Sequence, residues 1–106
     1  MQTYKSHRGE ILKNSPINTL QQLMCITMEE CGELTQRCSK IMRKYNHLSQ
    51  IEPDQRQKLL EEAGDVFCML ELMSENGVFD WKEIMDRADV KKEKLRIWSN
   101  LIAEKG

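Results

Sequence analysis

The chain has 106 residues and a net charge of −1, with 16 basic and 17 acidic side chains. Its length suits a single domain, residues 1–106, and its composition of 40% hydrophobic and 31% charged residues excludes a disordered or membrane-spanning chain. The charge balance argues against nucleic-acid and membrane-surface partners, both of which favour an excess of positive charge. The first residues lack the apolar core of a secretory signal, so we expect a cytoplasmic protein.

Residues 1–15 carry no clear pattern and are predicted as a poorly defined segment, with at most a short helix through Ile11 and Leu12. A long helix is predicted over residues 19–46, and Asn18 with Gln21 has the spacing of a capping box at its start. Apolar and small residues then recur in steps of four and three, which predicts one buried seam along this helix. The seam consists of Leu20, Met24, Thr27, Cys31, Leu34, Cys38, Ile41 and Tyr45.

Residues 47–53 break this pattern and are predicted as a loop. A second helix is expected over residues 54–75, and Asn76-Gly77 is a typical C-terminal stop. Asp80, with Glu83 three positions later, is expected to cap a third helix that runs to about residue 103. The predicted core faces of these two helices are Leu59, Ala63, Val66, Leu70 and Met73, then Ile84, Ala88, Leu95, Trp98 and Ile102.

The sequence therefore predicts an all-α protein built from long amphipathic helices. A helix of about 27 residues is roughly 40 Å long, which exceeds the diameter expected for a compact domain of this size. We therefore expect oligomerisation, as a homodimer or homotetramer, to complete a fold of the four-helix-bundle type. The four cysteines form no CxxC pair, and we expect them to be buried apolar thiols.

Two acidic clusters stand out, and each has a glycine in the same relative place: Glu29-Glu30-Cys31-Gly32-Glu33 and Glu61-Glu62-Ala63-Gly64-Asp65. Helical spacing places Glu30 beside Glu33 and Glu62 beside Asp65, at the edge of each seam. Carboxylates gathered at an interface between two antiparallel helices repel one another, and a hard divalent cation relieves that repulsion. This pattern predicts a magnesium site, with manganese as a possible substitute, and glycines that allow a facing helix or a substrate to approach closely. A ferritin-like di-iron site is excluded because neither histidine follows a glutamate by three residues.

The motif Glu29-Glu30-x-x-Glu33, followed after twenty-eight residues by Glu62-x-x-Asp65, resembles the EExxE…ExxD signature of the all-α NTP pyrophosphatases, which include MazG. The resemblance covers roughly residues 20–98 and implies a Mg-dependent hydrolase that cleaves a nucleoside triphosphate to a monophosphate and pyrophosphate. It implies metal ligation by Glu30, Glu33, Glu62 and Asp65, and a secondary ligand or water-orienting role for Glu29. The resemblance supports a functional role for Glu61 less strongly, because an acid before the second motif is not a fixed part of the pattern.

The same resemblance implies phosphate binding by the basic run of the third helix. The candidates are Lys92, Arg96 and Lys94, and Asp89 lies on the same stripe as Lys92 and Arg96. Two other functions stay open: a non-enzymatic regulatory or partner-binding module on this scaffold, and a phosphoribosyl-ATP pyrophosphohydrolase. The base, the sugar and the number of metal ions are not specified by the sequence.

Overall fold

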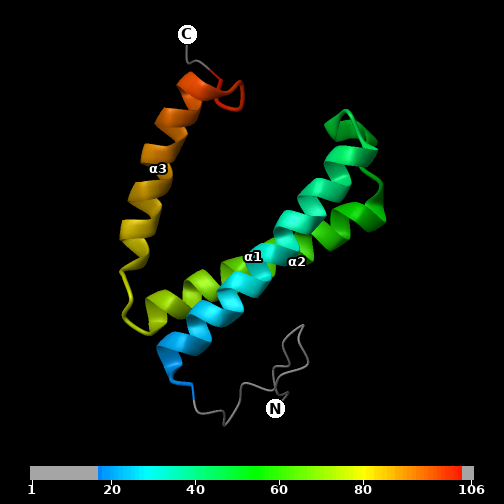
Figure 1. Ribbon diagram of the computed structural model, residues 1–106. Coiled ribbons are helices and arrows are strands. Elements are labelled where there is room, and N and C mark those ends of the chain that lie inside the picture. The colour runs from blue at the N-terminus through cyan, green and yellow to red at the C-terminus, as the bar shows by residue number, and fades with distance from the viewer. Residues whose placement is uncertain (1–16, 104–106) are drawn as a thin grey trace. The chain divides into compact units, whose positions relative to one another are not determined.

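The computed structural model describes residues 17–103, so the predicted N-terminal segment 1–15 lies outside the described residues. The described residues form three α-helices and one short 3-10 helix, and no strand is present among them, which confirms the all-α class (Figure 1). The helices are α1 (Thr19–Lys44), α2 (Pro53–Glu75) and α3 (Trp81–Trp98), with the 3-10 helix η1 (Leu48–Gln50) in the predicted loop. None of them is long and apolar enough to cross a bilayer.

The start of α1 follows the predicted capping box. The Asn18 side chain accepts a hydrogen bond from the Gln21 amide at 2.8 Å, and the Gln21 side chain accepts one from the Asn18 amide at 3.0 Å. These two bonds satisfy backbone donors that the first helical turn leaves without an intrahelical partner.

Gly77 ends α2 in the way that the sequence predicts. Its φ is +76°, its amide donates to the Ser74 carbonyl at 3.0 Å, and the Val78 amide donates to the Met73 carbonyl at 2.9 Å. This pair of bonds is a Schellman motif, in which a left-handed residue closes the last helical turn.

Replacing Gly77 with Ala is expected to lower the free energy of unfolding by about 1–2 kcal/mol, the strain of a left-handed L-residue. An added Cβ would meet nothing within 4 Å there, so backbone strain is the whole effect. Gly64→Ala, inside α2 and equally open, is the matched control and should stabilise the protein by up to ~1 kcal/mol. Urea denaturation measures both values, and equal effects of one sign would contradict this explanation.

The helix α3 is shorter than predicted, because it ends at Trp98 and not near residue 103. Ser99 is extended (φ −148°, ψ 174°), its hydroxyl donates to the Leu95 carbonyl at 2.8 Å, and it accepts from the Leu101 amide at 3.2 Å. A serine that bonds the backbone in this way competes with helix continuation. At the other end, Glu83 accepts a 2.8 Å hydrogen bond from the Asp80 amide, as expected for the predicted cap.

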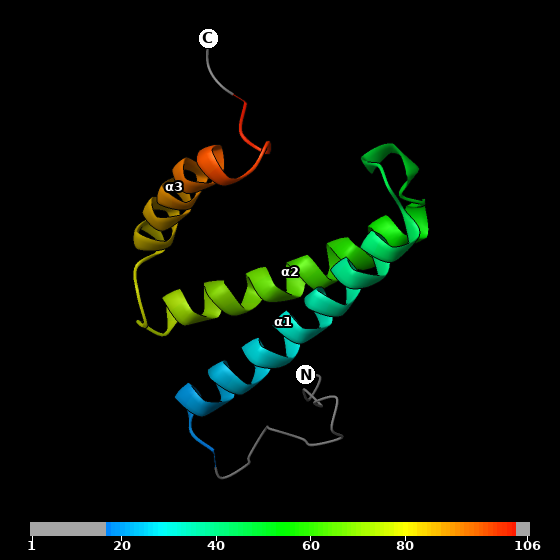
Figure 2. The same cartoon turned by 45° about the horizontal axis from the view of Figure 1, so that its top comes forward.

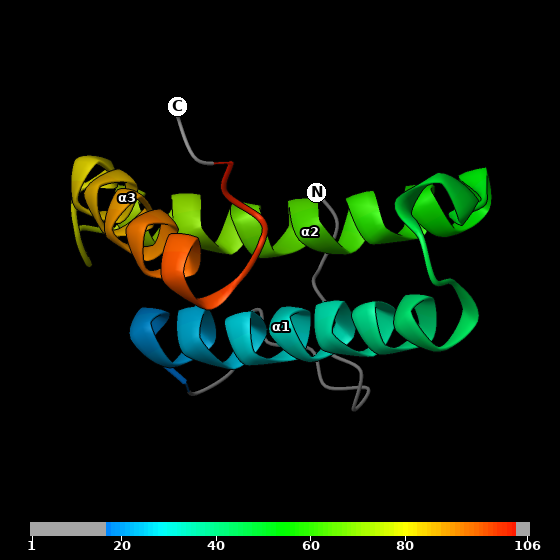
Figure 3. The same ribbon diagram turned by 90° about the horizontal axis from the view of Figure 1, so that it is seen from above.

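The chain divides into two compact units, Met1–Leu72 and Met73–Gly106. In the first unit, α1 and α2 run antiparallel and lie side by side, as the three ribbon views agree (Figures 1, 2 and 3). The linker between them is closed by polar contacts, in which Tyr45 donates to Glu52 at 3.2 Å and Lys44 pairs with the same carboxylate at 3.1 Å. The Glu52 contacts and the Tyr45 side chain raise the pKa of Lys44.

The buried side chains differ from the predicted seams. The described residues that are buried are Leu23, Glu30, Met69 and Met73, whereas Leu20 of the predicted seam is 58% exposed. Cys31, Cys38 and Cys68 are exposed and Cys25 is half-buried, so the expectation of four buried thiols is wrong for this chain by itself. The side of α1 that contacts α2 is rotated about the helix axis relative to the predicted seam. The contact therefore includes Glu30.

Candidate functional site

An acidic pocket lies between α1 and α2 and unites the two predicted motifs. It has a volume of about 330 Å³ and is lined by Glu30, Glu33, Arg37, Lys58, Glu61, Glu62 and Asp65. The four predicted metal ligands are therefore brought together, because each ExxE or ExxD spacing covers one helical turn and the two helices are antiparallel. Glu61, which the motif supports less well, lines the same pocket, whereas Glu29 is half-buried and does not belong to this lining.

Burial differs among these carboxylates. Glu30 is only 9% exposed, so it lies within the helix contact and not at its edge as predicted. Asp65 and Glu61 are exposed, and Glu33 and Glu62 are intermediate. The pocket thus runs from a buried carboxylate to solvent-facing ones, which gives a small ion or ligand access from outside.

A second pocket, larger and mainly apolar, adjoins the acidic one. Its volume is about 470 Å³, and Glu30 and Asp65 belong to the linings of both pockets. Leu23 and Ile26 of α1 face Met69 and Leu72 of α2 in its wall, with Thr19, Gln22 and Cys68 at its margins. The Gln22 side-chain amide donates to the Ile17 carbonyl at 3.1 Å. The volume and the mainly apolar wall are typical of small-molecule sites.

Arg37 was missed by the sequence analysis. Its Nε donates to Glu62 Oε2 at 3.1 Å and its Nη1 donates to Gln55 Oε1 at 3.0 Å. The Arg37 and Glu62 side chains are 13% and 16% exposed, so the ion pair is largely shielded from water. A signal was present in the sequence, since Arg37 follows Glu30 by seven residues and Glu33 by four and so shares their stripe.

The residues that line the acidic pocket have the donor chemistry of a magnesium site. Five acidic and two basic side chains leave an excess of three negative charges, and no thiol or imidazole competes with the carboxylate oxygens in this lining. Hard oxygen donors select magnesium or manganese over softer metals. Within residues 17–103, however, no three acidic, histidine or cysteine side chains are already gathered closely enough to hold a metal ion. A metal ion at this pocket would require the carboxylates to rotate.

The glycines were expected to let a facing helix or a substrate approach, and the structure tests the first of these. A Cβ built on Gly32 or Gly64 would meet nothing within 4 Å, so no facing helix of the described chain approaches them. The prediction of close helix packing at these two positions is wrong within this chain. Both glycines leave the surface next to the acidic residues open.

The basic candidates of the third helix belong to the second unit. Asp89, Lys92 and Lys94 are exposed on α3. Arg96 donates to Glu93 at 3.2 and 3.3 Å and to the Ala103 carbonyl at 3.3 Å, and its hydrogen bond lowers the pKa of Glu93. A role in substrate binding for these four residues, with the three basic ones on phosphate, stays a prediction. Arg37 and Lys58 are the two cations that line the acidic pocket.

Comparisons of this chain with protein-family models, with curated proteins and with solved structures gave no match. The resemblance to the all-α NTP pyrophosphatases thus depends on the two motifs, and functional inference depends on the geometry of the two pockets.

Proposed function

We propose that this protein is a magnesium-dependent nucleoside triphosphate pyrophosphohydrolase of the all-α, MazG-like type. The supporting observation is the pairing of a carboxylate pocket with an apolar pocket that shares Glu30 and Asp65 with it. In this proposal the apolar pocket holds the nucleoside, and the triphosphate extends along the acidic pocket. The reacting α-phosphate, which joins these two parts of the substrate, then lies near the two shared carboxylates.

Charge explains why a cation is needed. A pocket with three excess negative charges repels a triphosphate, and Arg37 and Lys58 together do not neutralise its five carboxylates. Glu30, Glu33, Glu62 and Asp65 would hold the cation. Bound magnesium supplies positive charge to the phosphate oxygens and eases proton loss from the attacking water.

The chain's own residues perform the remaining tasks. The apolar wall around Leu23 and Met69 fixes the base and excludes water from one side of the reacting phosphate. In this proposal Glu61, on the open side of the acidic pocket, orients water for attack on the α-phosphorus. The bond to the bridging oxygen breaks, and pyrophosphate leaves with the charge that develops on that oxygen.

A panel of canonical and modified ribo- and deoxyribonucleoside triphosphates tests this proposal. We expect magnesium-dependent formation of monophosphate and pyrophosphate from at least one of them, measured by chromatography and a pyrophosphate assay. Release of orthophosphate would show cleavage at another bond. A lack of turnover, together with no magnesium-dependent rise in melting temperature, would leave a non-enzymatic helical module as the better explanation.

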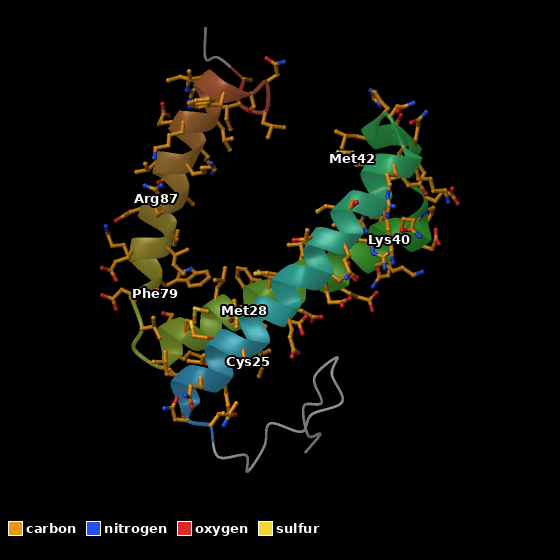
Figure 4. All side chains as sticks on the ribbon, in the orientation of Figure 1. Cys25, Met28, Lys40, Met42, Phe79 and Arg87 are labelled. Carbon is orange, nitrogen blue, oxygen red and sulfur yellow. The ribbon has the colours of Figure 1, made fainter. Side chains whose placement is uncertain are left out.

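We also propose that two copies combine their hairpins into a four-helix bundle. Every charged residue of α1 falls on one half of the helix circumference, and the other half is uncharged but open to solvent. Heptad-like spacing runs along this uncharged half through Met24, Met28, Cys31, Thr35, Cys38 and Met42, named here the α1 stripe. Met28 and Met42 are 68% and 77% exposed, and Met42 and Lys40 lie on opposite sides of α1 in Figure 4.

The helix α2 adds to the same side of the hairpin. Helical spacing turns Ala63 and Phe67 of α2 to the side that carries the α1 stripe, away from both pockets, and Phe67 is 50% exposed. We propose that a second copy of the chain covers this surface, because the spacing of the residues in the α1 stripe is symmetric about its midpoint near residue 33. Reversal pairs Met24 with Met42, Met28 with Cys38, and Cys31 with Thr35, as an antiparallel two-fold contact requires.

A further inference from the structure

Glu62 has two roles, one in an ion pair and one in the proposed metal binding, and a single carboxylate fills them at different times. In the described structure its Oε2 accepts from Arg37 Nε at 3.1 Å, within a pair that is 13% and 16% exposed. In the proposed function the same carboxylate is one of four metal ligands. The two roles compete, because a guanidinium and a divalent cation repel each other when both approach one carboxylate in a partly dry pocket.

We propose that Arg37 is a built-in counter-cation, which holds Glu62 in the metal-free protein and releases it when Glu62 takes a divalent cation. This inference depends on the proposed function, since it concerns the same carboxylates. Gln55 makes the release feasible, because its Oε1 accepts from Arg37 Nη1 at 3.0 Å and can retain the guanidinium after the Glu62 bond breaks.

The counter-cation also bears on the buried part of the acidic pocket. Glu30 is 9% exposed, and like charges at a buried helix contact repel one another unless an opposite charge lies close. Arg37 follows Glu33 by one helical turn and reaches across to α2, so it supplies that charge from within the pocket.

Release of Glu62 has a second consequence. The guanidinium stays in the pocket, where its planar donors suit phosphate oxygens better than a lysine would. Cation entry thus converts Arg37 from a partner of carboxylate into a partner of phosphate, and it favours binding of the cation before the triphosphate.

Nuclear magnetic resonance of the arginine Nε–H groups tests the exchange directly. The Arg37 signal is assigned by its loss in Arg37→Lys, and in metal-free protein we expect it to be protected from exchange with water. Titration with magnesium chloride should shift this signal and reduce its protection at least tenfold, in step with the backbone amide of Asp65. Retention of both shift and protection while the Asp65 amide moves would show that Arg37 stays on Glu62, and would overturn the inference.

Manganese affinity gives a second measurement. Arg37→Gln should bind Mn²⁺ about tenfold more tightly than the wild type by titration calorimetry, because the cation no longer competes with an arginine for Glu62. The matched control is Arg43→Gln on the same helix, where Nε donates to the Ser39 carbonyl and not to a carboxylate. Its affinity should stay within twofold of wild type. Equal or weaker binding by Arg37→Gln, with circular dichroism unchanged, would contradict competition.

The two proposals fail in different ways. If magnesium shifts no signal and no nucleotide is cleaved, the metal site itself is wrong and both proposals fall. If nucleotide is cleaved with magnesium while the Arg37 signal keeps its protection, the enzyme proposal stands and the counter-cation proposal fails.

Discussion

Asp65→Asn is expected to lower magnesium-dependent nucleotide turnover by about 100-fold or more while leaving the fold intact, because it removes one charged oxygen ligand. Asp65 lines both pockets and is exposed, so its neutral isostere breaks no buried ion pair. We expect the free energy of unfolding in the absence of metal to change by no more than about 0.5 kcal/mol. Steady-state kinetics and urea denaturation measure the two effects.

The matched control is Glu71→Gln, which changes an exposed carboxylate on the same helix outside both pockets. Its turnover should equal that of the wild type. Full activity in Asp65→Asn, or an equal loss in both variants, would show that Asp65 does not belong to the site.

Glu62→Gln is a poorer test of the metal site than the motif by itself suggests. It leaves Arg37, 13% exposed, without its charged partner and should destabilise the protein by about 1–3 kcal/mol.

Met28→Lys is expected to convert the proposed dimer into monomers. Met28 is 68% exposed in the isolated chain and lies on the α1 stripe, so the dimer would bury one lysine ammonium from each copy without a counter-charge. Such burial costs several kcal/mol per ion, which exceeds what a modest interface can absorb. Light scattering coupled to size-exclusion chromatography measures the change in mass.

Gln36→Lys serves as the control, because Gln36 is exposed on the charged half of α1, near Glu29 and Lys40. Its mass should match that of the wild type. A wild-type protein that is monomeric at high micromolar concentration would contradict the dimer proposal, and a Met28→Lys dimer would place the interface elsewhere. Loss of the dimer with turnover retained would show that one hairpin suffices for the site.

The sequence by itself determined the three helices and most of their ends. Short-range rules decide these features, so the Asn18 cap, the Gly77 stop and the cap of α3 at Asp80 followed from residue type and spacing. The end of α3 was predicted too late because the Ser99 hydroxyl bonds the backbone of Leu95 and Leu101, a competition that periodicity does not report. The grouping of Glu30 with Glu33, and of Glu62 with Asp65, was likewise a matter of helical spacing.

The tertiary structure decided which side of each helix meets the other. An amphipathic helix with charges on one half and apolar residues on the other permits two docking modes, and the hydrophobic pattern alone favours burying the apolar half. In the described chain, α1 and α2 instead meet along a line through Leu23, Glu30 and Met69, where Arg37 pairs with Glu62 across the contact. That choice places the carboxylates in a shared pocket and leaves the α1 stripe open. It depends on contacts between residues 25 positions apart, which no local spacing rule contains.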